Sequence, residues 1–338
     1  MQPFNSKIKS FLTKKRILIT GAAGFIGSFL TKKIVDLGCR PHILVNEKED
    51  LWRVRGILDH VRVFETNLTY YDIVARYIKT IKPEIIFHLA GVKNVSRDVD
   101  LVFPILDIDT KGTLNILHTL VKEKIEVKRV VLTGTCEEYG DGKTPFRESQ
   151  REISVSPYSA GRTALAYFSM MFNKIFNLPI TFLRPFLTYG PKQDLSMFIP
   201  SLISHCLERK KFLMTSGEQT REFNHVEDIA RAYILASYYD SAVGQIINIG
   251  NGKQYRIRDV AEKITGIMKA SAYLKIGALK QRRGETSEFY ADSKKAKALL
   301  HWQPQISFEQ GLQETIDWYT GNHRIMKKIC SSESPKNS

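Results

Sequence analysis

A glycine-rich turn near the beginning of the chain constrains the fold more than any other feature. A compact apolar run at residues 16–20 leads directly into GAAGFIG, and a segment with apolar residues at helical spacing follows and ends at Gly38. This order of strand, turn and helix predicts a dinucleotide-binding unit, because glycine lets a pyrophosphate approach the backbone and the helix N-terminus supplies free N–H groups. The turn residues predicted to bind the cofactor are Gly21, Gly24, Phe25, Ile26 and Gly27.

Strands and helices alternate beyond this turn. Apolar runs suited to strands occur at residues 41–45, 61–64, 84–89, 129–132, 180–183 and 245–249, with helical patterns between most of them. The alternation predicts an α/β fold, a Rossmann-like doubly wound parallel sheet with a smaller C-terminal substrate-binding lobe. We expect an NAD(P)-binding domain at 15–190, completed by about 221–250, a substrate lobe mostly at 191–320, and flexible tails at 1–14 and 322–338.

Residues that follow the strands are candidates for the rest of the cofactor site, since ligands of parallel sheets bind at the carboxyl ends of strands. Asn46 follows the second strand, where an acidic residue would favour NAD and an arginine NADP. Glu47 fits the first role, and Lys48 or Arg53 fits the second, so we expect NAD and leave NADP open. The remaining candidates are Asn67, Leu68, Leu89, Ala90 and Gly91.

The stretch from residue 130 to residue 162 carries the candidate chemistry. An apolar strand ends in Thr135, Cys136 and Glu137, and Tyr158 and Arg162 follow. Residues four apart share one face of a helix, so the arginine would lower the pKa of the phenol and make it a better proton carrier. The same pattern also fits a strand end, a loop and a surface helix whose side chains meet by chance.

Two other features have a structural interpretation. His88 ends the fourth predicted strand, where a core histidine is expected rather than a catalyst. The helix predicted at 160–176 carries four large apolar side chains on what we interpret as its packing side: Tyr167, Phe168, Met171 and Phe172.

Composition narrows the function classes. The 338 residues carry a formal net charge of +15, which suits anionic ligands such as dinucleotides and nucleotide sugars. Lysine and arginine are scattered, so we expect no specific nucleic-acid binding. The four cysteines lie far apart without metal-ligand spacing, which predicts no metal site and fits a reducing, cytoplasmic setting. The chain has neither a long apolar window nor a signal-like apolar core near its start, so we expect no membrane span.

Several motifs, taken in order, resemble the extended short-chain dehydrogenase/reductase family that acts on nucleotide-linked sugars. TGAAGFIG is similar to the family's cofactor turn, FHLAG to its fourth-strand signature, and RPFLTYGP to the strand and turn before its substrate lobe. REFNHVEDIARA is similar to the segment that contacts the nucleotide diphosphate, and RRGE with ADSKKAKALLHWQP to the C-terminal lobe. The resemblance covers nearly the whole chain.

The resemblance implies roles for individual residues. In the family a tyrosine, here Tyr158, is the acid/base on a sugar hydroxyl while hydride moves to or from nicotinamide. Thr135 would orient that oxygen, and Arg162 would take the place of the lysine that binds nicotinamide ribose and lowers the tyrosine pKa. A nucleotide-diphosphate sugar would be bound by Thr135, Arg221 and Arg282. The family also implies a homodimer through helices near 111–120 and 160–176.

Three positions depart from the family pattern. Arg162 replaces the lysine, Asp109 replaces the usual asparagine, and Asn67 replaces the usual aspartate near adenine. Arginine keeps a positive charge but is longer and planar, so the exchange is not neutral at a tight site. This leaves open a protein that binds dinucleotide and nucleotide sugar without turnover.

The residues after Thr135 indicate the branch of the family. Its sugar dehydratases resemble Thr-Asp-Glu here, with the acid protonating the leaving 6-hydroxyl and the glutamate removing the C5 proton. Glu137 is placed like that base, and Cys136 replaces the acid as a protonated but weaker donor. The set resembles a 4,6- or 5,6-dehydratase, the latter acting on a UDP-amino sugar. An NDP-sugar 4-epimerase or 4-ketoreductase is the alternative.

Overall fold

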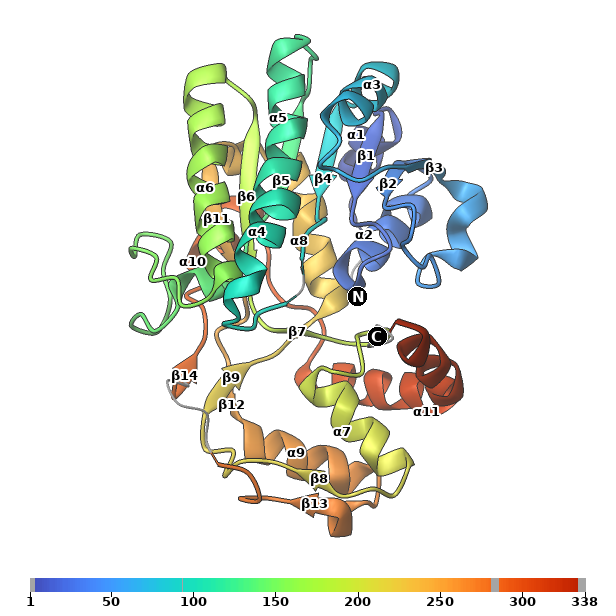
Figure 1. The fold of residues 1–338 in the computed structure, drawn as a ribbon, viewed down its shortest axis with the longest axis vertical. Helices are drawn as coiled ribbons and strands as arrows, with labels where there is room; N and C mark the ends of the chain where they lie inside the picture. Colours follow the sequence, from blue (N-terminus) through green and yellow to red (C-terminus); the bar gives the residue numbers. More distant parts are fainter. Residues whose placement is uncertain (1–3, 93, 281–285, 334–338) are drawn as a thin grey trace.

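A seven-stranded parallel sheet forms the centre of the computed structural model, which describes residues 4–92, 94–280 and 286–333 (Figure 1). The strands lie in the order β3-β2-β1-β4-β5-β6-β11, and each neighbouring pair is parallel. Their order reverses between β1 and β4, the point at which dinucleotides bind in sheets of this topology. The strands are β1 (Ile17–Thr20), β2 (His42–Val45), β3 (Arg62–Glu65), β4 (Ile85–His88), β5 (Arg129–Thr133), β6 (Ile180–Pro185) and β11 (Gln245–Ile249).

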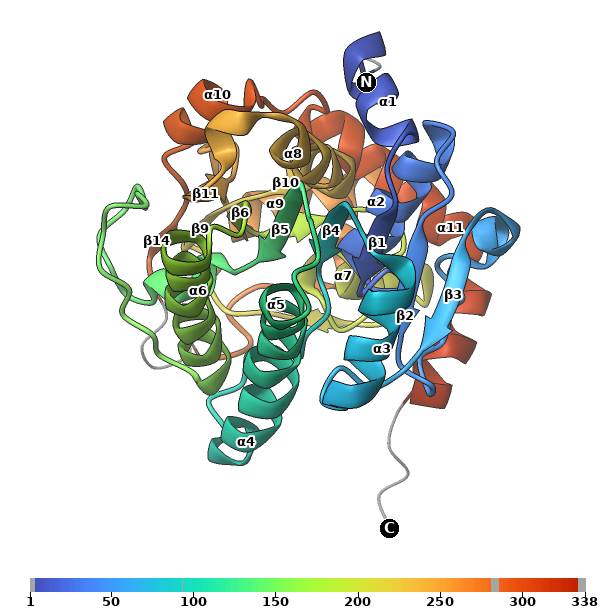
Figure 2. The same ribbon diagram turned by 90° about the horizontal axis from the view of Figure 1, so that it is seen from above.

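Helices cover both faces of the sheet, as Figure 2 shows from above. Successive strand residues enter different cores: Ile86 joins the cluster under one layer of helices, whereas Ile85 and Phe87 join the cluster under the other. This layering confirms the predicted doubly wound α/β fold. One layer contains α3 (Tyr71–Ile81), α5 (Gly112–Lys122) and α6 (Pro157–Phe176), and the other contains α1 (Ser6–Thr13), α2 (Phe25–Asp36) and α8 (Val226–Tyr238).

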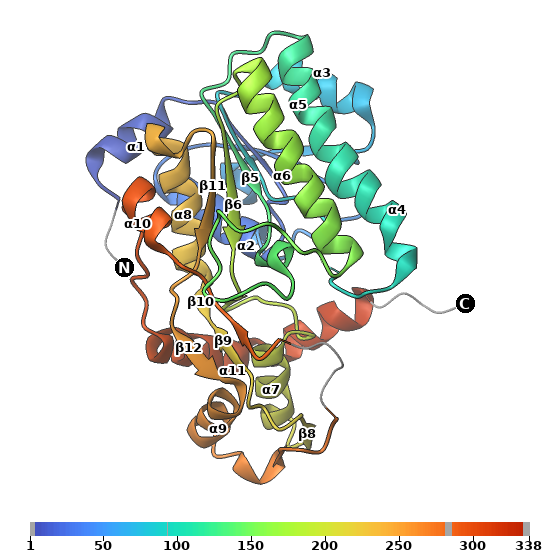
Figure 3. The ribbon, with the colours of Figure 1, turned by 90° about the vertical axis from the view of Figure 1, so that its left-hand side faces the viewer.

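A smaller lobe lies below the sheet in Figure 1 and is seen from the side in Figure 3. Its helices pack around their own apolar core, which includes Leu202, Ile264 and Leu312. The lobe helices are α7 (Phe198–Leu207), α9 (Ile257–Ile267) and α11 (Phe308–Glu333). Its short strands are β8 (Phe212–Leu213), β9 (Thr220–Glu222), β12 (Gln254–Arg256), β13 (Leu274–Lys275) and β14 (Glu288–Phe289).

Three further short elements are β7 (Thr188–Tyr189) and β10 (Asn224–His225), which pair with each other, and α10 (Lys294–Leu300), which packs against β11 and α8. Within the described residues, no helix is both long and apolar enough to cross a membrane.

The buried carboxyl group of Glu222, at the end of β9, ties several chain segments together. Its Oε2 accepts the backbone N–H of Gly252 over 2.8 Å, and its Oε1 accepts that of Ala291 over 2.8 Å. Burial raises the pKa of Glu222 to about 7, and the backbone hydrogen bonds oppose that rise. A Cβ on Gly250 would lie 2.6 Å from Oε1, so glycine at this position leaves room for the carboxyl group.

The ends of the chain differ from the expected flexible tails. Within residues 1–14, Ser6–Thr13 form α1, whose Ile8 and Leu12 are buried and whose Phe11 ring lies edge-on to Tyr238 at 5.5 Å. Helix α11 continues past residue 322 to Glu333. These parts of the expected tails are therefore helical, and a helix as short as α1 is stabilised mainly by packing against the rest of the fold.

The exposed side of α6 also differs from expectation. Phe172 is buried, but Tyr167 is 64% exposed, Phe168 41% and Met171 37%. The core prediction is therefore wrong for three of the four side chains, since helical spacing identifies a common face without showing what covers it.

Candidate active site

The glycine turn between β1 and α2 lies at the reversal of strand order. Gly21 has a φ of +68°, and a Cβ there would lie 2.6 Å from the backbone of Leu89 and Ala90 at the end of β4. A Cβ on Gly27 would lie 2.0 Å from the Gly21 carbonyl oxygen. Gly24 precedes α2 without a side chain to cap the first-turn N–H groups, which have no intrahelical acceptor. This arrangement fits the diphosphate of a dinucleotide.

The other predicted cofactor residues lie at the ends of neighbouring strands. Asn46 is exposed at the end of β2, and Asn67 and the buried Leu68 follow β3. Leu89, Ala90 and Gly91 follow β4. Both asparagine side chains accept a backbone N–H two residues further on, which shapes these strand-end turns. Arg53, considered for an NADP phosphate, is buried and donates to the Lys192 carbonyl over 3.0 Å.

A single 3₁₀ turn presents the predicted dehydratase residues. Thr135 precedes this turn, Cys136–Tyr139, and its hydroxyl accepts the N–H of Glu137 over 3.2 Å. Its own N–H donates to Oε1 of Glu138 over 2.7 Å. The reciprocal bonds form a capping box that fixes the backbone where Thr135, Cys136 and Glu137 are displayed.

A buried ionic network around Arg184 packs against this turn and supports it. Arg184, on β6, donates through Nε to Oε2 of Glu138 over 2.9 Å and through Nη1 to the Tyr139 hydroxyl over 2.9 Å. Its Nη2 pairs with Glu152 at 2.5 Å. Tyr139 in turn donates to the side chain of Asn248 over 2.7 Å. Because these charges are paired and hydrogen-bonded, the network can hold the turn rigidly despite its burial.

A cavity of about 680 Å³ opens beside the turn. It brings together the predicted Cys136, Glu137 and Arg221, and it adds Arg97 from the segment after β4. Apolar side chains contribute to its remaining wall: Val95, Val155, Leu187 and Phe289. Arg97 gave no sequence signal, because an isolated arginine in an irregular segment resembles any solvated side chain.

Burial and nearby charges set the protonation of this cavity's acids. Burial raises the pKa of Glu137, and the guanidinium groups of Arg221 and Arg97 counteract that rise. Burial also raises the pKa of the Cys136 thiol well above its usual range, aided by the negative charge of Glu137. The thiol is therefore protonated at neutral pH, while Glu137 has the raised pKa that suits a proton acceptor.

Tyr158 is half-buried at the beginning of α6, near Thr135. Burial raises the pKa of its phenol, and the positive charge of Arg162 and the hydrogen bond with Thr135 lower it in part. The Arg162 guanidinium carbon lies 5.4 Å from the centre of the Tyr158 ring. The structure thus brings together the predicted hydroxyl, phenol and cation.

Other predicted positions have simpler outcomes. Arg282 lies outside the described residues. His88 is buried as expected, with its ring nitrogens 2.6 Å from the Thr20 hydroxyl and 2.7 Å from the Thr113 hydroxyl, and burial lowers its pKa to about 3.

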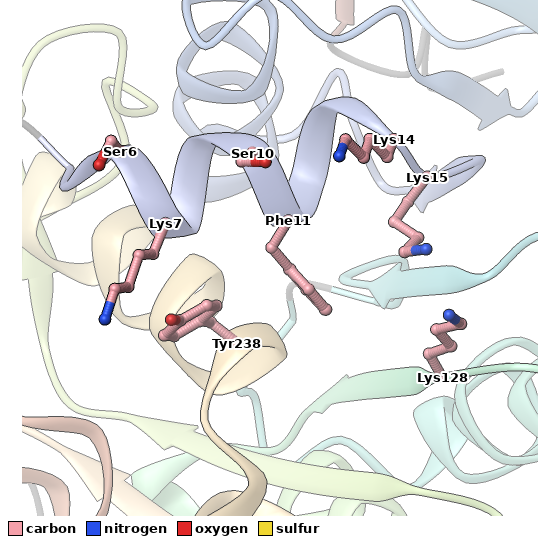
Figure 4. A pocket seen from close by; sticks show the side chains of 8 residues that line it. All are labelled: Ser6, Lys7, Ser10, Phe11, Lys14, Lys15, Lys128 and Tyr238. Atoms are coloured by element: carbon pink, nitrogen blue, oxygen red, sulfur yellow. The ribbon is translucent and has the colours of Figure 1, made fainter.

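A second cavity, of about 700 Å³, lies between α1 and α8 and holds none of the predicted site residues (Figure 4). Lys15 and Lys128 extend towards each other there, and Lys15 also pairs with Glu84 at 3.3 Å. This lysine-lined hollow accounts for part of the basic surface without adding candidate chemistry.

Known proteins resemble this chain in both sequence and fold. A family model described as GDP-mannose 4,6 dehydratase matches residues 18–315. A UDP-glucuronate 4-epimerase from Thermodesulfobacterium geofontis is 30% identical, and the alignment covers 92% of this chain and 98% of that protein. The structure of an epimerase from Methanothermobacter thermautotrophicus superposes with a TM-score of 0.86 at 26% identity, covering 97% of this chain and 99% of the other. A dTDP-glucose 4,6-dehydratase from Bacillus anthracis, solved in complex with NAD, gives a TM-score of 0.83 at 26% identity, covering 93% and 99%.

Proposed function

We propose that this chain is an NAD-dependent nucleotide-sugar dehydratase. The premise is that the chain belongs to the extended short-chain dehydrogenase/reductase family of NDP-sugar dehydratases and epimerases. The protein would act through transient oxidation at C4 of an NDP-hexose, by the 4,6 or the 5,6 route. The observation that carries the proposal is the position of Glu137 at the cavity, beside Cys136 and facing Arg97 and Arg221.

Tyr158 and Thr135 would act on the C4 hydroxyl. The proximity of their side chains supports a shared role at one substrate oxygen, in which Thr135 would orient that oxygen and Tyr158 would take its proton. Bound NAD would supply the hydride chemistry, which is oxidation at C4 and a later reduction of the sugar. The glycine cradle at Gly21 and Gly24 and the uncapped N-terminus of α2 would hold its diphosphate.

Glu137 and Cys136 would carry out the elimination. A C4 ketone acidifies the C5–H bond, and the carboxylate of Glu137 takes that proton. The C6 hydroxyl leaves as water with a proton supplied by the Cys136 thiol. Arg221, at the cavity wall, is placed to neutralise a substrate diphosphate, for which bidentate guanidinium donors are well suited.

Purified protein incubated with NAD and a panel of UDP-, GDP-, dTDP- and CDP-hexoses tests the proposal. Mass spectrometry should find a product lighter by one water for at least one sugar, and Glu137→Gln should abolish that loss. No loss of water across the panel would reject dehydration.

The 30% identical UDP-glucuronate 4-epimerase favours a second candidate, a 4-epimerase or 4-ketoreductase. A product of unchanged mass with inverted C4 stereochemistry, formed equally by Glu137→Gln, would support the epimerase. Cofactor and sugar binding with no turnover of any kind would instead support a non-catalytic binding protein, which the arginine at position 162 left open.

We also propose a homodimer. Helix α6 packs beside α4 (Val102–Ile105) and the π-helical turn Leu106–Lys111, and all three carry exposed large apolar side chains, which together define the proposed surface. Phe103 is 76% exposed within it. Apolar surface on this scale is typical of an interface between subunits. This surface includes α4 rather than α5, the helix that the family resemblance implied, because the apolar side chains of α5 are largely buried. Its other exposed members include Leu106, Tyr167, Phe168 and Ile175.

A further inference from the structure

Two of the positions that depart from the family pattern, Asp109 and Arg162, form one buried ion pair. Asp109 Oδ2 lies 3.0 Å from Arg162 Nε, Asp109 is fully buried, and Arg162 is 3% exposed. We propose that Asp109 is a positioning residue for the reaction: it holds the Arg162 guanidinium in one place beside Tyr158 and links that cation to the segment that lines the sugar cavity. The proposal rests on the proposed function, in which Tyr158 moves the proton.

The guanidinium is held from more than one direction. Besides the ion pair, Arg162 Nη1 donates to the Thr133 carbonyl at the end of β5 over 2.8 Å. An ideal Cβ at position 91 would lie 1.9 Å from Arg162 Nη2 and 2.9 Å from Asp109 Oδ1. The absence of a side chain at Gly91 therefore makes room for the guanidinium. Arg162 is fixed at the cofactor edge of the sheet, where Gly91 follows β4.

Asp109 also anchors the start of the segment after β4. Its Oδ1 accepts the backbone N–H of Val92 over 2.7 Å. The same segment continues to Val95, Ser96 and Arg97, which line the cavity beside Glu137. One carboxylate therefore fixes the cation next to the phenol through Oδ2 and the cavity segment through Oδ1. Asp109 sits on the π-helical turn Leu106–Lys111, a geometry that often marks functional positions.

The charge of Asp109 sets how strongly Arg162 acts on the phenol. Arg162 stabilises the phenolate of Tyr158, whereas the carboxylate of Asp109 opposes it. The other ionisable groups that face Tyr158 are the Cys136 thiol and the Tyr233 hydroxyl, from the 3₁₀ turn and α8. Removing the carboxylate charge while keeping its shape exposes the phenol to an uncompensated cation.

Asp109→Asn tests the proposal because asparagine keeps an oxygen for the Val92 N–H. In turnover with the substrate found by the panel, the acid limb of the pH profile should move down by about one unit, the shift expected when one nearby charge is removed. The value of kcat should fall at least tenfold with little change in KM, because the guanidinium, still held beside the phenol by the Thr133 carbonyl, loses the carboxylate that orients it. An unmoved acid limb would overturn the proposal.

A second measurement does not depend on turnover. Tyr158 ionisation is obtained from the near-ultraviolet tyrosinate band as the difference between each protein and its Tyr158→Phe partner. The Tyr158 titration should lie lower in Asp109→Asn than in the wild type, and identical titrations would overturn the proposal even if no sugar is turned over. Failure of the proposed function alone would leave this difference intact.

The variant D109N/R162K changes both members of the buried ion pair, removing the charge of Asp109 and replacing the guanidinium by an ammonium group, and guards against a folding defect in D109N alone. If the residues act as a pair, the effect of R162K on kcat in the wild-type background should differ at least fivefold from its effect in the D109N background. Independent, multiplicative effects would overturn the pairing.

Discussion

The guanidinium of Arg184 contacts the carboxylate of Glu138 at 2.7 Å, and neither side chain is exposed to solvent. The two residues are 46 positions apart, and their contact lies directly beneath the turn that displays Thr135, Cys136 and Glu137. Glu138 therefore links β6 to this turn and helps to fix the geometry of the candidate site.

Glu138→Gln should destabilise the protein by about 3 kcal/mol, because removing one charge of a buried pair leaves the other uncompensated. Urea unfolding at neutral pH measures this free energy of unfolding. Glu152→Gln is the control: Glu152 also pairs with Arg184 but is partly exposed, so its loss should cost less. Equal costs for the two variants would contradict the supporting role of Glu138.

Tyr158→Phe should lower kcat about 100-fold or more, the usual cost of removing a positioned acid/base. The helix offers a matched control in Tyr167→Phe, a tyrosine nine residues further on that is 64% exposed. Steady-state turnover of the sugar identified by the panel measures both. A similar loss in Tyr167→Phe would show that the effect arises from helix packing rather than from proton transfer.

Arg97→Met should raise the pH at which the elimination becomes fast. Arg97 counteracts the burial that raises the Glu137 pKa, so its removal should raise that pKa further and leave the carboxyl protonated to higher pH. The pH dependence of solvent deuterium incorporation at C5, followed by NMR, reports this step. Exposed Arg151→Met serves as the control for loss of one positive charge. If deuterium incorporation in Arg97→Met instead became fast at a lower pH than in the wild type, Arg97 would not be lowering the pKa of Glu137.

His225→Phe should flatten the acid side of the stability profile. Burial, aided by Lys33, lowers the pKa of His225 to about 4, whereas the unfolded chain binds a proton there below about pH 6.5. The free energy of unfolding therefore falls as pH drops from about 6.5 to 4, by up to about 1.4 kcal/mol per pH unit. Phenylalanine keeps the ring beside Tyr189 and removes the titration.

Urea unfolding at several pH values between 4 and 7 compares His225→Phe with the wild type and with a variant of exposed His60. The wild type should lose more stability than His225→Phe on acidification. Parallel profiles for all three proteins would show that His225 does not contribute to the acid dependence.

Phe103→Asp should convert the expected dimer into a monomer, because a charge in an apolar interface loses its hydration. Light scattering coupled to size exclusion measures the mass. Leu213→Asp, at an exposed leucine in the lobe, is the matched control and should leave the mass unchanged. A monomeric wild type would reject the proposed interface.

The fold was predictable because its signals are local. The strand, glycine turn and helix around Gly21 are encoded within about 20 consecutive residues, and period-2 and period-3.6 patterns identify the following elements. Helix α1 escaped prediction because only its contact with residues such as Tyr238, far along the chain, stabilises so short a segment.

The site was predictable only where residues are neighbours in sequence or match a motif. Thr135, Cys136 and Glu137 share one turn, and Tyr158 and Arg162 share one helix face. The partners that set their geometry come from elsewhere: Arg184 from β6 and Asp109 from the turn before α5. No periodic pattern pairs such distant side chains, so only the three-dimensional structure shows that Asp109 and Arg162 meet.

The carboxyl group of Glu222 affects which mutations the wall of the cavity beside Glu137 can tolerate. Its two hydrogen-bond donors at Gly252 and Ala291 are backbone N–H groups, which survive exchange of most neighbouring side chains. The segment that ends at Ala291 also carries Phe289 into the cavity wall. Mutations there can reshape the cavity wall while the chain path stays anchored. Because Glu222 holds the backbone, side chains around it can be exchanged without loss of the chain path. Phe289 is therefore a suitable position at which to alter the cavity wall by mutation.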